Sequence, residues 1–370
     1  MSICIRSVPM RNHDFIQTKA HFSFNATDCL RNAYFHNDCR HCMELCPTDA
    51  LVLVRHKLTL LDTECLACAA CIGSCPTEAL RLEGFDPNAF TLAFQQQMPL
   101  LSCQNNTPCL GVFDTHHYIT MALQGEDAPC CDLSHCEACH LNHTGKVEQS
   151  IRHKITQSNS FLEAVGMHAQ RVTVIEEPVN KTSDRRALFR TALTKVHDAM
   201  TEEVQEESPS TIKPHALPAT LPVKYTIVKH AIQEHIERFS TTDVASFESL
   251  FFNKTIDFDA CTNCGDCIQF CPTEALFATS DKQGIFFKSG HCIGCGICDD
   301  ICKSNAITSV AGLDLIAVAF DRGEELVHYE MVMCHECRCP YPYKGGDPIC
   351  DRCKEFTDSF ENMFVLAKDQ

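Results

Sequence analysis

Cysteines dominate the chemistry that this sequence could perform. The chain has 370 residues, of which 28 are Cys, against 23 Phe, 6 Tyr and no Trp. Most of the cysteines fall into closely spaced runs, two stretches hold looser groups, and Cys4 and Cys29 stand alone. Closely spaced thiolates bind metal ions and iron–sulfur clusters, and such bonds can replace part of a missing apolar core. The spacing therefore decides which cofactor is expected.

The most complete pattern lies between residues 261 and 302, where Cys-x2-Cys-x2-Cys-x3-Cys occurs twice. This pattern resembles the bacterial two-cluster ferredoxins, in which the fourth Cys of each run ligates the other cluster. The resemblance implies two [4Fe-4S] clusters, one on Cys261, Cys264, Cys267 and Cys302 and the other on Cys292, Cys295, Cys298 and Cys271. Lys303 replaces the family's Pro after the last Cys. We expect a small local change there without loss of the ligand.

A similar pattern lies between residues 36 and 75, but its first Cys is missing. The resemblance implies one cluster on Cys46, Cys65, Cys68 and Cys71 and a second on Cys39, Cys42, Cys75 and a further ligand. His36 stands where the family has Cys and is our first choice, because a neutral imidazole would raise the cluster potential. Cys29 is its rival. A three-iron cluster and a non-ligating His36 remain open.

Six cysteines between residues 98 and 140 flank a helix expected over 118–123, and besides the adjacent pair Cys130-Cys131 they are the candidate ligands Cys103, Cys109, Cys136 and Cys139. Over about forty residues this stretch loosely resembles the thioredoxin-like [2Fe-2S] ferredoxins. A [2Fe-2S] centre, a structural zinc ion and buried thiols all stay open. The Cys136-Glu-Ala-Cys139-His140 pentad matches the haem c attachment pattern, which we reject because residues 1–19 lack an apolar export signal.

The C-terminal cysteines form two Cys-x2-Cys knuckles separated by twelve residues: Cys334, Cys337, Cys350 and Cys353. Two such knuckles are typical of a zinc ribbon, in which four thiolates bind one ion tetrahedrally. A rubredoxin-type iron uses similar knuckles, and Cys339 could join an added iron–sulfur cluster. Zinc is favoured, because the segment is short and Pro340, Pro342 and Gly345-Gly346 suggest a rigid turn.

The elements that position these cysteines are short, and they predict an α+β fold. The repeat Cys-Pro-Thr-Asp/Glu-Ala-Leu begins at Cys46, Cys75 and Cys271 and, in degenerate form, at Cys302, which indicates a duplicated module. Strands are expected at 51–54, 58–61, 276–278 and 285–287, helices at 188–196 and 228–239, and a mobile linker at 201–222.

We expect five segments: ferredoxin-like module 1 at 1–95, a small α/β Cys-containing domain at 96–175, a helical region and linker at 176–250, ferredoxin-like module 2 at 251–312, and a zinc-ribbon-like domain at 313–370.

Composition excludes several classes of function. The net charge of −17 argues against nucleic acid, which needs a basic face. No apolar run is long enough to span a membrane, and the start lacks a signal peptide, so we expect a cytoplasmic protein. Walker A, G-x-G-x-x-G and H-E-x-x-H motifs are absent from the sequence, so we expect no substrate activation by the isolated chain.

The function expected from the sequence is single-electron relay through about four [4Fe-4S] clusters. The chain would be a subunit or partner of an oxidoreductase of the formate dehydrogenase or hydrogenase type, by analogy of fold alone. The alternative is a redox-sensing or assembly factor whose metal sites organise a binding surface.

Overall fold

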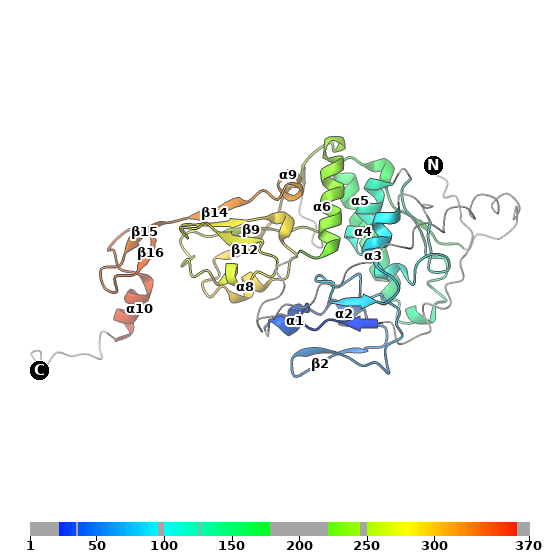
Figure 1. Cartoon of the computed structure of the whole chain (residues 1–370), viewed down its shortest axis with the longest axis horizontal. Coiled ribbons are helices and arrows are strands. Elements are labelled where there is room, and N and C mark those ends of the chain that lie inside the picture. Colours follow the sequence, from blue (N-terminus) through cyan, green and yellow to red (C-terminus); the bar gives the residue numbers. More distant parts are fainter. Residues whose placement is uncertain are drawn as a thin grey trace, which may run out of the picture. The chain divides into compact units, whose positions relative to one another are not determined.

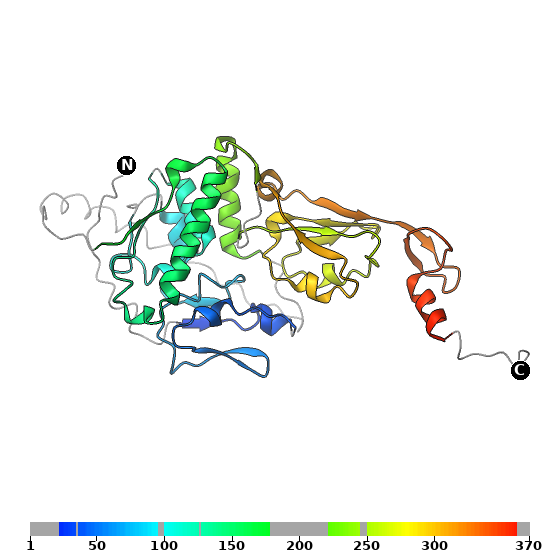
Figure 2. The same cartoon turned by 180° about the vertical axis from the view of Figure 1, so that it is seen from behind.

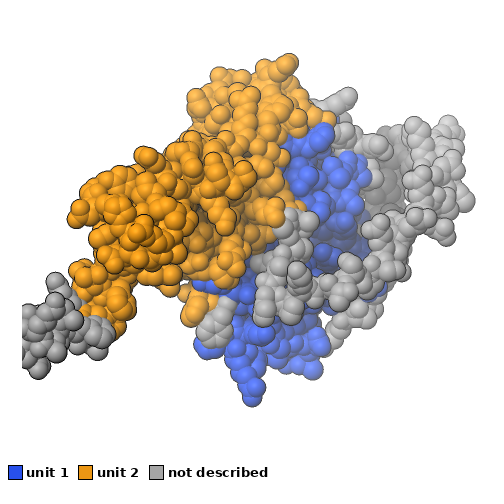
Figure 3. All heavy atoms as spheres, turned by 60° about the vertical axis from the view of Figure 1, so that its left-hand side comes forward, with its two compact units in different colours: residues 1–35, 39–218, 222–231 blue, residues 36–38, 219–221, 232–370 orange. Residues whose placement is uncertain are grey.

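The computed structural model describes residues 22–34, 36–94, 100–125, 127–177, 221–244 and 250–360. Two compact units make up the chain, coloured separately in Figure 3: unit 1 contains residues 1–35, 39–218 and 222–231, and unit 2 contains 36–38, 219–221 and 232–370. Both mix short helices and strands, so the α+β class is confirmed. Within the described ranges, no helix has the length and apolar character needed to cross a bilayer. The helix expected over 188–196 and the linker up to residue 220 lie outside the described residues.

The N-terminal part of unit 1 consists of two antiparallel strand pairs (Figure 1). These pairs are β1 (Phe22–Phe24) with β4 (Leu80–Leu82), and β2 (Leu51–Val54) with β3 (Lys57–Leu60). Arg55 and His56 both have positive φ, of 51° and 67°, as the two central residues of a tight hairpin turn require. The expected strands at 51–54 and 58–61 therefore form one hairpin, shifted by one residue in the second strand. Two short helices, α1 (Leu30–Ala33) and α2 (His41–Leu45), lie between β1 and β2 in the chain.

A small parallel sheet forms the rest of unit 1. Its strand order is β5 (Leu100–Leu101), β6 (Cys130–Asp132), β7 (Thr173–Ile175). The crossover helices are α4 (Thr115–Gln124) and α5 (Lys146–Ala164), which lie side by side in Figures 1 and 2. The helix expected at 118–123 begins earlier because Asp114 caps it, accepting a hydrogen bond from the backbone N–H of Thr115 at 2.8 Å. A further helix, α3 (Pro87–Ala93), packs on α4.

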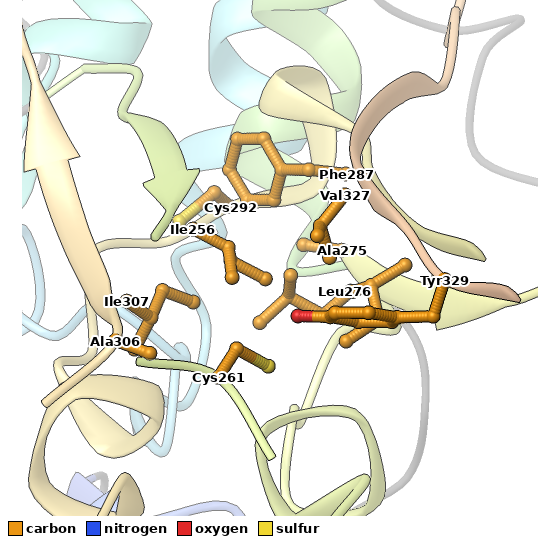
Figure 4. Packing of buried hydrophobic residues seen from close by; sticks show 11 residues of the cluster. Ile256, Cys261, Ala275, Leu276, Phe287, Cys292, Ala306, Ile307, Val327 and Tyr329 are labelled. Atoms are coloured by element: carbon orange, nitrogen blue, oxygen red, sulfur yellow. The ribbon is translucent and has the colours of Figure 1, made fainter. Parts of the chain in front are cut away.

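Residues 253–328 of unit 2 form antiparallel strands around a small core. Strand β9 (Asn253–Ile256) pairs with β12 (Ile307–Val310), and β10 (Leu276–Ala278), β11 (Gly284–Phe287) and β14 (Glu324–His328) form a second sheet. Short helices α7 (Asp266–Gln269) and α8 (Ile297–Ile301) lie within the two Cys runs and contain the third Cys of each. Figure 4 shows Cys261 and Cys292 within the same buried cluster as Leu276, Phe287 and Tyr329. The cysteines therefore belong to the core that holds the strands together.

The remaining elements of unit 2 are a two-residue strand pair, a short helix and a C-terminal hairpin with its helix. They are β8 (Asp243–Val244) with β13 (Leu313–Asp314), α9 (Leu315–Ala319), β15 (Glu330–Met333) with β16 (Pro340–Tyr343), and α10 (Asp351–Phe360). The helix expected at 228–239 corresponds to α6 (Val223–His235) and the following turn Ile236–Arg238.

A buried ion pair holds the first turn of α6 in unit 1. The Lys224 side chain is 2% exposed, and its Nζ donates to Asp114 Oδ2 at 2.6 Å and to the carbonyl oxygen of Cys75 at 2.8 Å. Although burial opposes ionisation, Lys224 and His116 hold the pKa of Asp114 well below its usual range. One carboxylate thus caps α4 and neutralises the lysine of α6.

Removing Asp114 alone should be costly because it leaves Lys224 buried without its counter-ion. Asp114→Ala should lower the free energy of unfolding of unit 1 by about 3–5 kcal/mol. The double variant Asp114→Ala/Lys224→Met should recover part of this loss. Urea titration followed by far-UV circular dichroism without oxygen measures both, with the exposed Asp62→Ala as control. Equal midpoints for the single and double variants would contradict the ion pair's role.

Candidate metal centres

All four copies of the sequence repeat adopt the same loop. In each, the third residue after the Cys has positive φ: 51° at Asp49, 54° at Glu78, 54° at Glu274 and 52° at Asn305. This conformation turns the next backbone N–H back onto the sulfur. The N–H to Sγ distance, measured between heavy atoms, is 3.3 Å for Cys46, Cys75 and Cys302. The Cys302 loop keeps this geometry although Lys303 replaces the Pro.

The Cys-x2-Cys turns use a second left-handed position. Ala67 and Asn263, two residues after Cys65 and Cys261, have φ of 50° and 52°, and their N–H groups donate to those sulfurs at 3.4 Å. Left-handed φ is unfavourable for residues with a Cβ, so these loops are held by their surroundings. Their shared result is backbone N–H groups aimed at sulfur, which favours thiolate and raises cluster potentials.

Two pockets in unit 1 each gather four cysteines. Set 1 consists of Cys46, Cys65, Cys68 and Cys71 and lines the first pocket. Set 2 consists of Cys29, Cys39, Cys42 and Cys75 and lines the second. The pocket lining thus reproduces the crossed grouping that the ferredoxin resemblance implies, in which Cys46 and Cys75 exchange places.

Cys29, and not His36, lines the pocket of set 2. Cys29 is 8% exposed and lies at the start of α1, whereas His36 is exposed and residues 36–38 belong to unit 2. Burial, followed by the nearby Cys75 and Cys29, raises the pKa of Cys39 to about 12. The geometry therefore favours the rival that the sequence ranked second.

In unit 2 the electrostatic interactions between the cysteines follow the same crossed grouping. Set 3 consists of Cys261, Cys264, Cys267 and Cys302, and set 4 consists of Cys271, Cys292, Cys295 and Cys298. Burial, followed by Cys261, Cys264 and Cys302, raises the pKa of Cys267 to about 12. Burial and then Cys271 raise the pKa of Cys295 to about 11 despite an opposing backbone hydrogen bond. Thiols this close need a metal or a proton to offset their mutual repulsion.

Lys254 supplies a buried cation beside set 4. The residue is 5% exposed, and its Nζ donates to both carboxylate oxygens of Asp299, at 2.6 and 2.9 Å, and to Ser309 Oγ at 2.8 Å. Burial opposes the charge of Lys254, but Cys298 and Asp299 outweigh it and raise the pKa of the lysine. A cation here lowers the cost of adding negative charge to a group held by set 4.

The four cysteines of the parallel sheet also converge. Cys103 and Cys109 follow β5, Cys136 and Cys139 follow β6, and the carboxyl ends of neighbouring parallel strands lie at one edge. Burial and then Cys103 raise the pKa of Cys136 to about 12, and burial and then Cys139 raise that of Cys103 to about 11. We name these four residues the sheet set.

The C-terminal cysteines form the tightest group. The tail set consists of Cys334, Cys337, Cys350 and Cys353, whose sulfur atoms all lie within 4.8 Å of one another. The Cys337 and Cys350 sulfurs are 3.8 Å apart. In a regular tetrahedron with edges of this length, the centre lies about 2.3 Å from each corner, which is the usual distance between zinc and a thiolate sulfur. Burial opposes ionisation of Cys334, but backbone N–H groups of Cys350 and Cys337 lower its pKa to about 6. Cys339 is exposed and is not part of this group.

The spacing of the cysteines does not predict the buried basic side chains that lie near the sulfurs. Arg31 is 7% exposed and its Nη1 lies 3.5 Å from the carbonyl oxygen of Cys39, while Lys154 is 6% exposed on α5. Desolvation lowers the pKa of Lys154 to about 8. A long basic side chain reads as solvent-facing in sequence, so only tertiary packing could reveal these residues.

Residues 253–303 match the family model of the 4Fe-4S dicluster domain. This match covers both Cys runs of sets 3 and 4. No curated protein matches the chain. The chain therefore contains a 4Fe-4S dicluster domain in unit 2, and its further groups of cysteines support an iron–sulfur protein with a role in electron transfer.

Proposed function

We propose that this chain relays single electrons between redox proteins through four [4Fe-4S] clusters, held by sets 1 to 4. The observation that carries the proposal is that all four sets take their fourth cysteine from the other run in the same crossed way. Sets 1, 3 and 4 each contain three closely spaced cysteines, and set 2 contains Cys39, Cys42 and Cys29. The fourth cysteine of every set comes from the left-handed loop of the other run. Unit 1 repeats the arrangement that unit 2 has within its dicluster domain.

The chain's own residues would tune and shield the clusters. Backbone N–H groups such as those of Ala50 and Ala79 donate to ligand sulfurs and favour the more reduced state. Apolar side chains such as Leu276 and Phe287 keep water from the set 3 and set 4 region. Each cluster supplies the capacity to accept and release one electron.

The partners in this proposal are redox proteins. The net charge of −17, which bound clusters make more negative, favours a docking surface that offers Lys and Arg. A formate dehydrogenase or hydrogenase complex is the class that we propose, with this chain as its electron-transfer subunit or partner. The five-segment division remains part of the proposal, and the tail set would bind zinc as a ribbon-like docking element.

A redox-sensing or assembly factor is the second candidate. The tail set favours it, because a single ion at the end of a β15–β16 hairpin can organise a surface without any redox change. Stopped-flow oxidation separates the two candidates. A relay passes electrons from its reduced clusters to an acceptor protein rapidly, whereas a sensor or assembly factor does not.

The metal content of protein purified without oxygen tests the proposal directly. Four cubane clusters predict about sixteen iron and sixteen sulfide per chain, with about one zinc from the tail set. Iron and sulfide are measured colorimetrically and zinc by mass spectrometry. Several zinc ions with little iron or sulfide would make the chain a metal-organised scaffold and refute the relay.

Replacement of Cys29 should damage one cluster, whereas replacement of His36 should not. Cys29→Ser should lower the iron content by about one to four per chain, as set 2 forms a three-iron cluster or none. His36→Ala should leave the iron content and the set of midpoint potentials unchanged. Iron analysis and low-temperature electron paramagnetic resonance distinguish these outcomes. Loss of iron in His36→Ala, with no loss in Cys29→Ser, would instead identify His36 as the ligand.

Removal of the Lys254 charge should make the set 4 cluster harder to reduce. Lys254→Met should lower its midpoint potential by roughly 60 mV, a tenfold change in a one-electron equilibrium. The exposed Lys282→Met, in the turn between β10 and β11, serves as the matched control and should shift no potential. Redox titration monitored by electron paramagnetic resonance measures both variants. An unchanged potential in Lys254→Met would show that Asp299 already cancels the charge.

A further inference from the structure

Two glycines in unit 1 mark a close contact between the loop after Cys68 and the loop after Cys109. A Cβ on Gly73 would lie 2.4 Å from the carbonyl oxygen of Phe113 and 2.5 Å from that of Gly111. A Cβ on Gly111 would lie 3.1 Å from both Cα and Cβ of Ala70. The two main chains therefore touch with no room for a side chain between them.

Each side of this contact leads directly to a metal-binding sulfur. Gly111 donates its backbone N–H to the Cys109 sulfur at 3.4 Å. Ala70 is covalently joined to Cys71, a member of set 1. A path from Cys109 to Cys71 thus needs one hydrogen bond, a few covalent bonds and one van der Waals contact.

The sheet set is more open than the four-cysteine group of the tail. Within the described part of the chain, the tail set is the group whose ligand atoms all lie within 4.8 Å of one another. The sheet set is more open, as are sets 1 to 4, yet its members still act on one another electrostatically. Four thiolates shared by two irons stand further apart than four thiolates around one zinc ion. The open spacing is compatible with a [2Fe-2S] centre.

One buried cation serves both sites. Lys154 extends from α5, and its Nζ donates to the carbonyl oxygen of Phe113 at 3.1 Å, within the contact itself. Its charge interacts with both Cys109 of the sheet set and Cys71 of set 1. A cation between two electron-accepting centres stabilises the reduced state of each.

We infer that the sheet set holds a [2Fe-2S] centre that exchanges electrons directly with the set 1 cluster through the Gly111–Ala70 contact. This inference rests on the proposed function in requiring a [4Fe-4S] cluster on set 1. One electron leaves one centre, which is oxidised, and reduces the other, and no bond or proton moves. The parallel-sheet part of unit 1 is then a fifth station and an electron port of the relay.

Magnetic coupling between the two centres tests the inference. In the full-length protein poised electrochemically without oxygen, the relaxation rate of the two-iron resonance should rise several-fold once the set 1 cluster is reduced. Pulsed electron paramagnetic resonance measures this rate. A relaxation rate that does not change with the redox state of the set 1 cluster would overturn the inference. Zinc in place of iron on the sheet set would overturn it as well. The four-cluster relay would survive either result, whereas loss of cubane iron throughout would refute the relay itself.

Two variants probe the contact. Gly73→Ala should push the 111–113 loop away and weaken the relaxation enhancement, while Gly125→Ala should not, although its Cβ meets a carbonyl oxygen at 2.8 Å in the same unit. Lys154→Met, which keeps the shape of the side chain, should shift the potentials of both centres downward. Lys146→Met, exposed at the start of the same helix, should shift neither. A shift of only one potential in Lys154→Met would contradict a cation shared by the two sites.

Discussion

The strongest physical constraint on this chain is the convergence of four sulfurs at each metal-binding site, where they repel one another as thiolates. The loops offset this repulsion by directing backbone N–H groups at the sulfurs. Asp49, Glu78 and Glu274 adopt left-handed φ, which costs roughly 1–3 kcal/mol each, and thereby aim an N–H at sulfur. Because the free energy of metal binding is also free energy of folding, a bound metal centre would offset the strain of these loops.

Buried cations are the second consequence of the same constraint. Arg31, Lys154 and Lys254 lie beside different groups of cysteines, and each would be costly to bury in an apolar core. Next to thiolates or an anionic cluster, the desolvation cost is offset by attraction, and the charge then acts on the redox potential. Stability and potential are therefore set by the same side chains.

The spacing of cysteines predicts the grouping of sets 1, 3 and 4, because the left-handed loop is encoded within a few residues of each Cys, and the members of set 1 line one pocket. The α+β class and the short hairpins followed from equally local patterns. Cys29 could not be placed in this way. It is ten residues before Cys39, and helix α1 with the turn after it brings it into the pocket. The Gly73–Phe113 contact depends on packing between segments forty residues apart and has no local signal.

The departure of set 2 from the ferredoxin pattern changes more than one ligand. After Cys65 and Cys261, a left-handed residue aims its N–H at the first sulfur of the run. Among the described residues 36–48, none has positive φ, and the chain passes from Cys39 directly into α2. Set 2 keeps a backbone N–H group at the Cys39 sulfur, supplied by His41 without a left-handed residue, and adds the buried guanidinium of Arg31. A buried positive charge thus acts on the sulfur of Cys39 together with a directed hydrogen bond.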